Sequence, residues 1–233
     1  MIITAVIITV VGVIALVLFL EKKCKQYSVS AAMTKSLVSF MFMAVAIIGT
    51  VHKGDIVSAL ITLGLLFGLL GDIFLDLKFV HRSDEKIYTV GGFKVFAFGH
   101  VLYIIAMLIA YADFSKVVYI IIPLVLGVLG GFLVILLGKP MKLDYGEYEK
   151  ISRYYGMILL GDTFLAVSLA IMHSLSEASL NLMALGLILF TVSDLVLSNT
   201  YFGTDHEKPI DFILNYVSYY AGQFLVAWSL LLR

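Results

Sequence analysis

The chain contains eight apolar runs, each long enough to cross a lipid bilayer as a helix. A hydrocarbon core of ~30 Å takes about 20 residues of α-helix, because each residue advances the helix by ~1.5 Å. Such a chain is expected to fold as an all-α, polytopic membrane protein. The predicted membrane helices are residues 2–20, 33–51, 56–77, 93–111, 117–137, 152–172, 179–198 and 212–232.

Composition agrees with a membrane protein. The 233 residues are 61% hydrophobic and 14% charged, whereas soluble domains are about 25% charged. The loops are short, so we predict one transmembrane domain over residues 1–233. The net charge is zero, which argues against a nucleic-acid partner. The single cysteine, Cys24, excludes an internal disulfide and a Cys-rich metal site.

Lysine and arginine concentrate in alternate loops, which predicts the orientation in the membrane. The loops after the first, third, fifth and seventh runs carry eleven basic residues, and the opposite side carries three. These four basic loops are therefore expected in the cytoplasm, with both termini outside. The eleven residues are Lys22, Lys23, Lys25, Lys78, Arg82, Lys86, Lys139, Lys142, Lys150, Arg153 and Lys208.

Three of the predicted membrane helices contain an aspartate in similar local sequence: Asp72 in LLGDIFLDL, Asp162 in LLGDTFLAV and Asp194 in VSDLVLS. An acid inside a bilayer costs at least ~2.5 kcal/mol, so its default interpretation is functional. On the predicted orientation, Asp72 lies ~8 Å and Asp194 ~6 Å from the cytoplasmic ends of their helices. Asp162 lies ~15 Å deep, near the midplane.

Other polar residues fall in the same half of the predicted bundle. His100 lies ~10 Å inside the fourth run, and Lys35 opens the second. Asn215, Tyr219 and Gln223 follow one another at intervals of four, which places them on one stripe of the eighth helix. Because five helices, besides the second with Lys35 at its start, carry polar groups between the midplane and the cytoplasm, we predict one cavity there.

The order of these residues indicates an internal repeat. His100 follows Asp72 by 28 positions, and Gln223 follows Asp194 by 29. The third and fourth helices would then match the seventh and eighth in a parallel 4+4 duplication. Such a repeat would place Asp72 and Asp194 in equivalent positions, and repeat-built membrane proteins often carry their site between the repeats.

Two carboxylates facing one apolar cavity suit acid–base catalysis, because one can keep its proton while the other stays ionised. Asp72 and Asp194 are the natural pair, with His100 expected to orient or tune one of them. Tyr103 shares the face of His100. A zinc site usually needs three protein ligands, yet only His100 is a histidine well inside the membrane. No G-x-S-x-G nucleophile motif is present, so no metal or other cofactor is expected.

Structural roles compete with these interpretations. Each acid could instead bind a lysine or histidine to hold helices together, most readily Asp162. The stripe on the eighth helix could form interhelical hydrogen bonds or line the site. Asp76 is expected to be interfacial and solvated. A proton-coupled transporter of a lipid or an amphipathic small molecule is the main alternative function, whereas a scaffold gives no reason for several intramembrane acids.

Four segments carry a family resemblance: LLFGLLGDIFL, FKVFAFGHVLYI, LILFTVSDLVLS and YVSYYAGQFLVAWSL. The chain resembles the YhhN-like lysoplasmalogenase family of integral membrane proteins over nearly its whole length. That family tends to have Lys-Pro in the second helix, whereas Ser36 follows Lys35 here. The resemblance implies a multi-pass protein of the cell membrane, surrounded by membrane lipid. It also implies a hydrolase whose substrate is a lysophospholipid, lysoplasmalogen, and whose reaction cleaves the vinyl ether bond of that lipid.

The products implied by the resemblance are a fatty aldehyde and a glycerophosphoethanolamine or glycerophosphocholine. Vinyl ethers hydrolyse by protonation at carbon, followed by capture of the cation by water, which fits an acid–base pair. Our hypothesis is that one of Asp72 and Asp194 donates the proton and the other acts as base, in either order. The lipid chain would lie among apolar helices, with Lys35 and Tyr219 contacting the phosphate.

Overall fold

The computed structural model describes residues 1–25, 29–203 and 209–233. Eight long helices and no strand occur in this part of the chain. Three short 3₁₀ helices, Arg82–Asp84, Phe114–Lys116 and Gly146–Tyr148, lie in connections. The long helices are α1 (Ile2–Lys25), α2 (Val29–Lys53), α3 (Ile56–Val80), α4 (Glu85–Tyr111), α5 (Val118–Gly138), α6 (Glu149–Met172), α7 (Ala178–Phe202) and α8 (Pro209–Leu232).

The predicted helices are all present, and several extend further than predicted at one end. For example, α4 begins at Glu85 instead of residue 93, and α7 ends at Phe202 instead of residue 198. The apolar runs mark the length that a bilayer covers, whereas helical hydrogen bonds continue into polar residues beyond it. Several observed helices therefore extend beyond the apolar runs that were predicted to cross the membrane.

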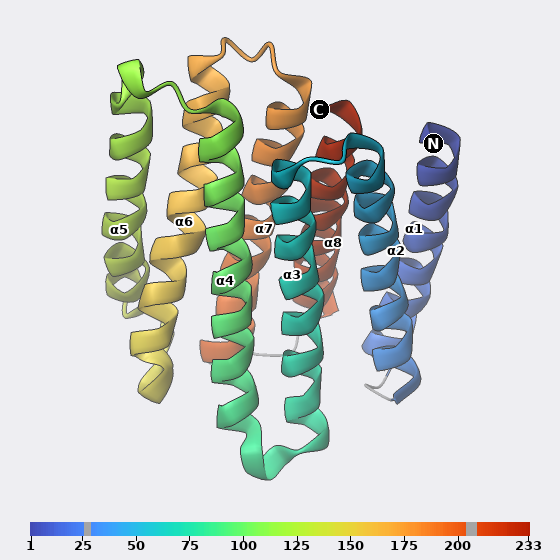
Figure 1. The fold of residues 1–233 in the computed structure, drawn as a ribbon. Coiled ribbons are helices and arrows are strands. Elements are labelled where there is room, and N and C mark those ends of the chain that lie inside the picture. The colour runs from blue at the N-terminus through green and yellow to red at the C-terminus, as the bar shows by residue number, and fades with distance from the viewer. Residues whose placement is uncertain (26–28, 204–208) are drawn as a thin grey trace.

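Both termini lie at one end of the bundle, together with the α2–α3, α4–α5 and α6–α7 connections (Figure 1). We call this the terminal end. The α3–α4 and α5–α6 connections lie at the opposite end, together with the last residues of α1 and α7 and the first residues of α2 and α8. We call this the basic end because lysines and arginines gather there in the sequence. Lys208 falls outside the described residues. Placement of the basic end in the cytoplasm stays a prediction.

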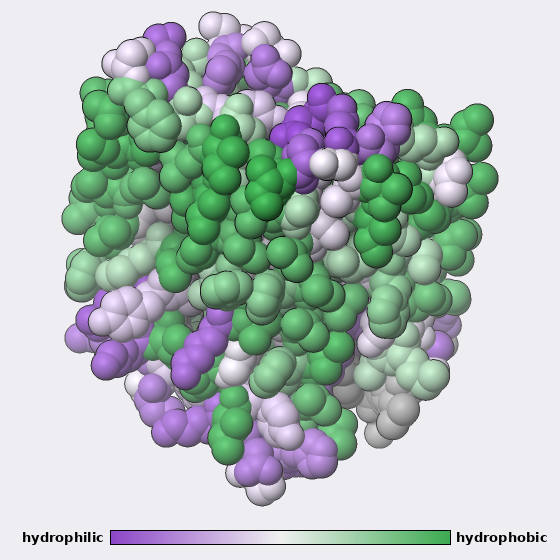
Figure 2. Space-filling model, viewed as in Figure 1, coloured by the Kyte–Doolittle hydropathy of each residue, from purple (hydrophilic) through white to green (hydrophobic). Residues whose placement is uncertain are grey.

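The surface is that of a polytopic membrane protein. Hydrophobic residues cover the middle of the face shown in Figure 2, and hydrophilic residues gather at its two ends. Seven of the described helices, α1 to α7, are long and apolar enough to cross a membrane. The apolar character of α8 is interrupted by Asn215, Tyr219 and Gln223, all of which are buried in the bundle.

Six helices surround the interior, and two lie outside them. α1 packs on α2, and α5 packs on α6; only 22% of the apolar segment of either outer helix is buried. α2 also contacts α3 and α8, while α6 contacts α7 and α4. When each helix is replaced by the one four positions away in the chain, each of these helix pairs becomes another of them. A parallel duplication would produce this pattern. The 4+4 repeat itself stays a prediction.

Glycines allow two helix pairs to cross closely. A Cβ added at Gly99 on α4 would lie 2.9 Å from the carbonyl oxygen of Gly64 on α3. A Cβ added at Gly222 on α8 would lie 2.6 Å from the carbonyl oxygen of Gly186 on α7. Real Cβ atoms do not approach so closely, so a side chain at either position would force the backbones apart. These crossings bring α3 against α4 and α7 against α8, beside the acids that they carry.

Candidate active site

Asp72 lies on α3 and is bound by side chains from two other helices. Oδ2 accepts hydrogen bonds from Ser39 Oγ of α2 and Tyr219 OH of α8, each at 2.9 Å. The Nζ of Lys35, one turn before Ser39 on α2, lies 3.3 Å from Oδ1. A cation and two hydroxyl donors are the surroundings of an ionised carboxylate. α2, α3 and α8 thus hold Asp72 in one orientation.

Lys35 also binds a second acid. Its Nζ lies 2.9 Å from Oδ1 of Asp76, one helical turn beyond Asp72 on α3. The side chain of Lys35 is 4% exposed and that of Asp76 is 15% exposed. The expectation that Asp76 is solvated is therefore wrong. The buried ammonium attracts a second carboxylate because both charges need a partner away from water.

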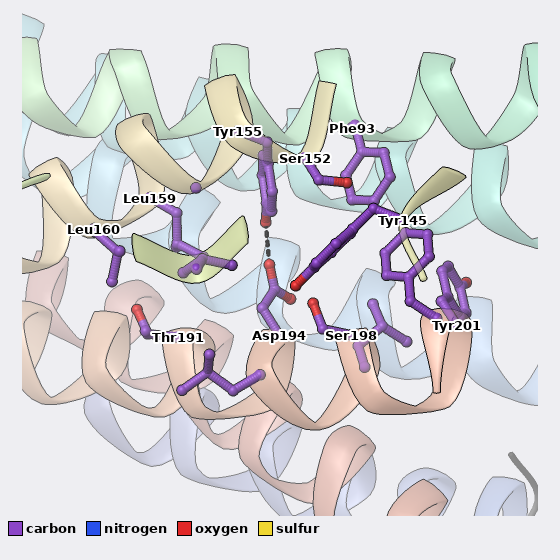
Figure 3. A pocket seen from close by; sticks show the side chains of 15 residues that line it. Phe93, Tyr145, Ser152, Tyr155, Leu159, Leu160, Thr191, Asp194, Ser198 and Tyr201 are labelled. Atoms are coloured by element: carbon purple, nitrogen blue, oxygen red, sulfur yellow. Dashed lines mark hydrogen bonds between the residues drawn. The ribbon is translucent and has the colours of Figure 1, made fainter. Parts of the chain in front are cut away.

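Asp194 lies on α7 with a different set of neighbours. It accepts a hydrogen bond from the hydroxyl of Tyr155 on α6, and Figure 3 shows this hydroxyl pointing at the carboxylate. No lysine, arginine or histidine in the described part of the chain forms an ion pair with it. The two acids therefore differ in that Asp72 faces a cation and Asp194 does not.

One cavity joins the two acids. It has about 550 Å³ of space not filled by protein atoms and is lined from α2, α3, α4, α6, α7 and α8. Asp72 contributes from the α3 side and Asp194 from the α7 side. Its polar lining residues include Lys35, Asp76, Tyr155, Ser193, Asp194, Tyr201, Asn215, Tyr216 and Tyr219. A small reacting group placed here would lie between a carboxylate bound to a lysine and a carboxyl group bound to a tyrosine.

A second, mostly apolar cavity opens beside Asp194 (Figure 3). It also measures about 550 Å³ and is lined mainly from α6 and α7, with Val134 from α5. Tyr155 and Asp194 line both this cavity and the one that contains Asp72. Leu159 and Leu160 follow Tyr155 along α6 into the apolar space. An aliphatic chain fits such a lining, and its polar end would point at Asp194.

His100 does not contact either of these acids. Its Nδ1 lies 2.8 Å from Oδ2 of Asp162, and both side chains are buried, so His100 does not orient Asp72 or Asp194 by direct contact. Tyr103 packs edge-on against the His100 ring, with 5.7 Å between ring centroids. This arrangement ties α4 to α6 beside the cavity and does not line it.

Asp162 and Gln223 each keep one buried oxygen free. Oδ1 of Asp162 and Oε1 of Gln223 have no hydrogen-bond partner among the described residues. Gln223 donates instead to the hydroxyl of Tyr219, at 3.1 Å. It therefore supports the tyrosine that binds Asp72. The stripe on α8 combines the two roles left open by the sequence, since Asn215 lines the cavity and also donates to Ser193 on α7 at 2.9 and 3.0 Å.

Sequence reasoning missed several residues that the fold brings to the cavity. Ser39 lies four residues after Lys35 and therefore on the same face of α2. Tyr155 lies seven residues before Asp162, two turns away on the same face of α6. These spacings were signals that could have identified both. Tyr201 and Tyr216 had no such signal, because tyrosines near helix ends usually lie at the membrane interface.

In the part of the chain that the structure describes, no three His, Cys, Asp or Glu side chains are grouped so that they could hold a metal ion. The candidate site instead offers two carboxylates, one ammonium and several tyrosine hydroxyls.

The profile of the YhhN family matches residues 30–230. The chain belongs to the YhhN family. No curated protein matches the chain, and neither does any solved structure. The family match begins at the start of α2 and ends within α8, so it includes each acid described above.

Within this YhhN-family protein, the peripheral helix α1 lies wholly before the matched segment. The six helices that line the cavity all fall within the match, at least in part. The resemblance expected from the four motifs is therefore confirmed, and it covers the part of the fold that builds the site.

Proposed function

We propose that this YhhN-family protein is a membrane hydrolase of the cell membrane that cleaves the vinyl ether bond of lysoplasmalogen or a related lysolipid. The products are a fatty aldehyde and a glycerophosphoethanolamine or glycerophosphocholine. The observation that carries the proposal is that Asp72 and Asp194 line one cavity, while of these two acids only Asp72 has a cation beside it among the described residues. Acid–base chemistry needs two such unlike carboxyl groups.

The proposal assigns the proton donor to Asp194. When Asp194 is protonated it carries no charge, so it needs no cation beside it in the bundle. The Tyr155 hydroxyl holds the Asp194 side chain in its orientation. The proton goes to the vinyl carbon remote from the ether oxygen. The carbon–carbon double bond is consumed, and the carbon attached to oxygen becomes an oxocarbenium cation. This step needs positioning of the vinyl group within proton-transfer distance of the acid.

The proposal assigns the base to Asp72. Its carboxylate stabilises the adjacent oxocarbenium and accepts a proton from the water that attacks it. The resulting hemiacetal loses the glycerol oxygen as an alcohol, which takes up a proton, and releases the aldehyde. Lys35, Ser39 and Tyr219 keep the carboxylate oriented throughout. The overall reaction adds one water across the ether bond.

Substrate placement follows from the lining of the two cavities. The hydrocarbon chain would lie in the apolar cavity beside Leu159 and Leu160. The vinyl ether would then reach the space between Asp194 and Asp72, because Asp194 lines both cavities. Burial of each methylene of the chain contributes ~0.8 kcal/mol, so the chain supplies binding energy that holds the reacting bond in place.

The test is aldehyde release from a lysoplasmenyl lipid by purified Asp72→Asn and Asp194→Asn proteins in detergent. Each variant should lose ~10²–10⁴-fold in turnover, the range that a positioned acid or base supplies. Asp84→Asn, an exposed acid outside the site, is the matched control and should keep wild-type turnover. If both site variants fold and keep near wild-type turnover, the acid–base proposal is wrong.

The transporter alternative gives a different result in proteoliposomes. A transporter would move the lipid between compartments without forming aldehyde, and would show no product in detergent. Aldehyde formation by the detergent-solubilised protein therefore separates the two functions.

A further inference from the structure

A third cavity lies at the basic end, and nothing in the proposed chemistry uses it. It has about 890 Å³ of unfilled space and is more polar than the apolar cavity. We call it the vestibule. It is lined by Lys23, Lys78, Phe79, Glu85, Thr89, Tyr148, Leu197, Thr200, Tyr201, Phe202, Phe212, Asn215 and Tyr216.

Lys78 is the unusual member of this lining. It lies on α3 and is 7% exposed, yet its ammonium forms no ion pair within the described part of the chain. Its Nζ lies 3.5 Å above the ring of Tyr201 on α7. Glu85 lines the same vestibule without reaching Lys78 as an ion pair. The same Nζ lies 5.2 Å from the centroid of the Phe79 ring. A buried cation whose close partners among the described residues are aromatic faces has an unmet requirement for an anion.

The vestibule continues into the cavity of Asp72 and Asp194. Five residues line both spaces: Phe79, Leu197, Tyr201, Asn215 and Tyr216. Lys78 follows Asp72 by six residues on the same helix, which corresponds to ~9 Å along the axis. In a lysophospholipid, five covalent bonds separate the ether oxygen from the phosphorus. A glycerol linker leading from the acids toward the vestibule would therefore bring the phosphate toward Lys78.

Lys35 is less available for this role. Its ammonium already lies against two carboxylates, those of Asp72 and Asp76, and Tyr219 donates its hydroxyl proton to Asp72. An incoming phosphate at Lys35 would meet two negative charges, whereas at Lys78 it would meet an unpaired positive one.

We propose that the vestibule is a phosphate-binding site in which Lys78 is the cation that pairs with the phosphodiester of a lysophospholipid headgroup. That this phosphate belongs to the lipid being hydrolysed rests on the proposed function. Tyr201 and Tyr216 also line the space, and a tyrosine hydroxyl can donate a further hydrogen bond to a phosphate oxygen. The apolar cavity then takes the chain, the central cavity takes the reacting bond and the vestibule takes the headgroup.

The experiment measures binding, not turnover, on the full-length protein in detergent. The probe is 1-palmitoyl-lysophosphatidylcholine, an ester lipid without a vinyl ether, used below its critical micelle concentration. Monopalmitoylglycerol, which lacks the phosphate, and inorganic phosphate are the comparison ligands. Wild type should bind the lysolipid more tightly than the monoacylglycerol. Lys78→Met should weaken lysolipid binding by about tenfold or more, the loss expected for one charged contact.

Two matched variants complete the design. Lys78→Arg keeps the charge and should retain lysolipid affinity within a few-fold. Lys86→Met removes an exposed lysine of the same end that pairs with Glu147, and should bind as wild type. Without ligand, Lys78→Met should unfold at the same temperature as wild type or higher, because it removes an unpaired buried charge. A lower unfolding temperature would indicate a structural lysine and overturn the proposal.

The remaining outcomes are equally decisive. Equal lysolipid affinity in Lys78→Met and wild type overturns the site. So does an equal loss of monoacylglycerol affinity, since that ligand has no phosphate. Lys78-dependent binding of inorganic phosphate alone, without lysolipid binding, overturns its assignment to a lipid headgroup. If no vinyl ether is hydrolysed but the binding depends on Lys78, the hydrolase proposal fails and the phosphate site stands.

Discussion

The ammonium of Lys35 lies 3.3 Å from the carboxylate of Asp72, in an ion pair that joins α2 to α3 inside the bundle. Both side chains are under a tenth exposed, and the same ammonium binds Asp76 at 2.9 Å. One lysine therefore compensates two acids away from water. The arrangement makes Lys35 a determinant of both stability and charge at the candidate site.

Replacing Lys35 by methionine should destabilise the protein strongly. The change leaves Asp72 and Asp76 buried without their cation, and breaking a buried pair costs ~3–5 kcal/mol. Unfolding in detergent measures this loss. Lys35→Met combined with Asp76→Asn should recover part of the stability, because one uncompensated charge is removed. If the single variant is as stable as wild type, the ion pairs do not hold α2 to α3.

Tyr219→Phe tests the orientation of Asp72. The change removes only the hydroxyl that donates to Oδ2, and the ring still packs against Phe190. A hydrogen bond to a charged group contributes ~1.5–3 kcal/mol, so turnover of the lysoplasmenyl lipid should fall ~10-fold or more. Tyr154→Phe, an exposed tyrosine on α6, is the control. Unchanged turnover in Tyr219→Phe would remove the hydroxyl from the mechanism.

The pair of His100 and Asp162 should be structural. Asp162→Asn weakens a buried contact between α4 and α6, and should cost ~1–3 kcal/mol of stability. Turnover per folded molecule should fall far less than in Asp194→Asn, because neither residue of the pair lines the central cavity. A double-mutant cycle with His100→Asn should give a coupling energy of ~0.5–3 kcal/mol. A loss of turnover as large as that of Asp194→Asn would place Asp162 in the chemistry.

The close helix crossings give a prediction for glycine. Gly222→Ala places a Cβ 2.6 Å from the backbone of α7, and such overpacking should cost ~1–3 kcal/mol. Gly99→Ala should behave similarly at the α3–α4 crossing if the two helix pairs are repeats. Gly156→Ala is the control, because its Cβ would make an ordinary 3.6 Å contact. That variant should be as stable as wild type, which thermal unfolding measures side by side.

Asp55, at the terminal end of the bundle, should stabilise the fold in a way that depends on pH. Asp55 caps α3 by accepting from the backbone N–H of Ser58 at 2.9 Å, and it binds the guanidinium of Arg233. Partial burial opposes the effect, but these two partners lower the pKa of Asp55. The contribution of Asp55 to folding stability is therefore complete above the pKa of the unfolded state, ~3.9. It is lost as the pH falls through the lower pKa of Asp55 in the folded state.

Asp55→Ala should therefore be less stable than wild type at neutral pH, by ~1 kcal/mol for the lost cap. The difference should shrink as the pH falls below the unfolded pKa, since the wild-type carboxylate is then protonated too. Unfolding of both proteins over a series of pH values measures this. A difference that stays constant down to the lowest pH would show that the charge of Asp55 is not involved.

The amino-acid sequence by itself determined the class of protein and its outline. Apolar runs of bilayer length specify membrane helices because every backbone polar group must be satisfied within the helix. Alternate basic loops predicted which connections share an end, and the two of them that the structure describes in full, α3–α4 and α5–α6, lie together. The motifs around Asp72, His100, Asp194 and Gln223 also identified the family correctly. Each of these features is local, so it can be read from neighbouring residues.

Only the tertiary structure decided which side chains meet. Asp72 and Asp194 were predicted to face one cavity, and they do. Yet His100 binds Asp162, and Lys35 binds Asp76 as well as Asp72. These contacts depend on the rotation of each helix about its axis and on which helices are neighbours. Glycine crossings and close packing set both, and helical periodicity within a single segment does not specify them.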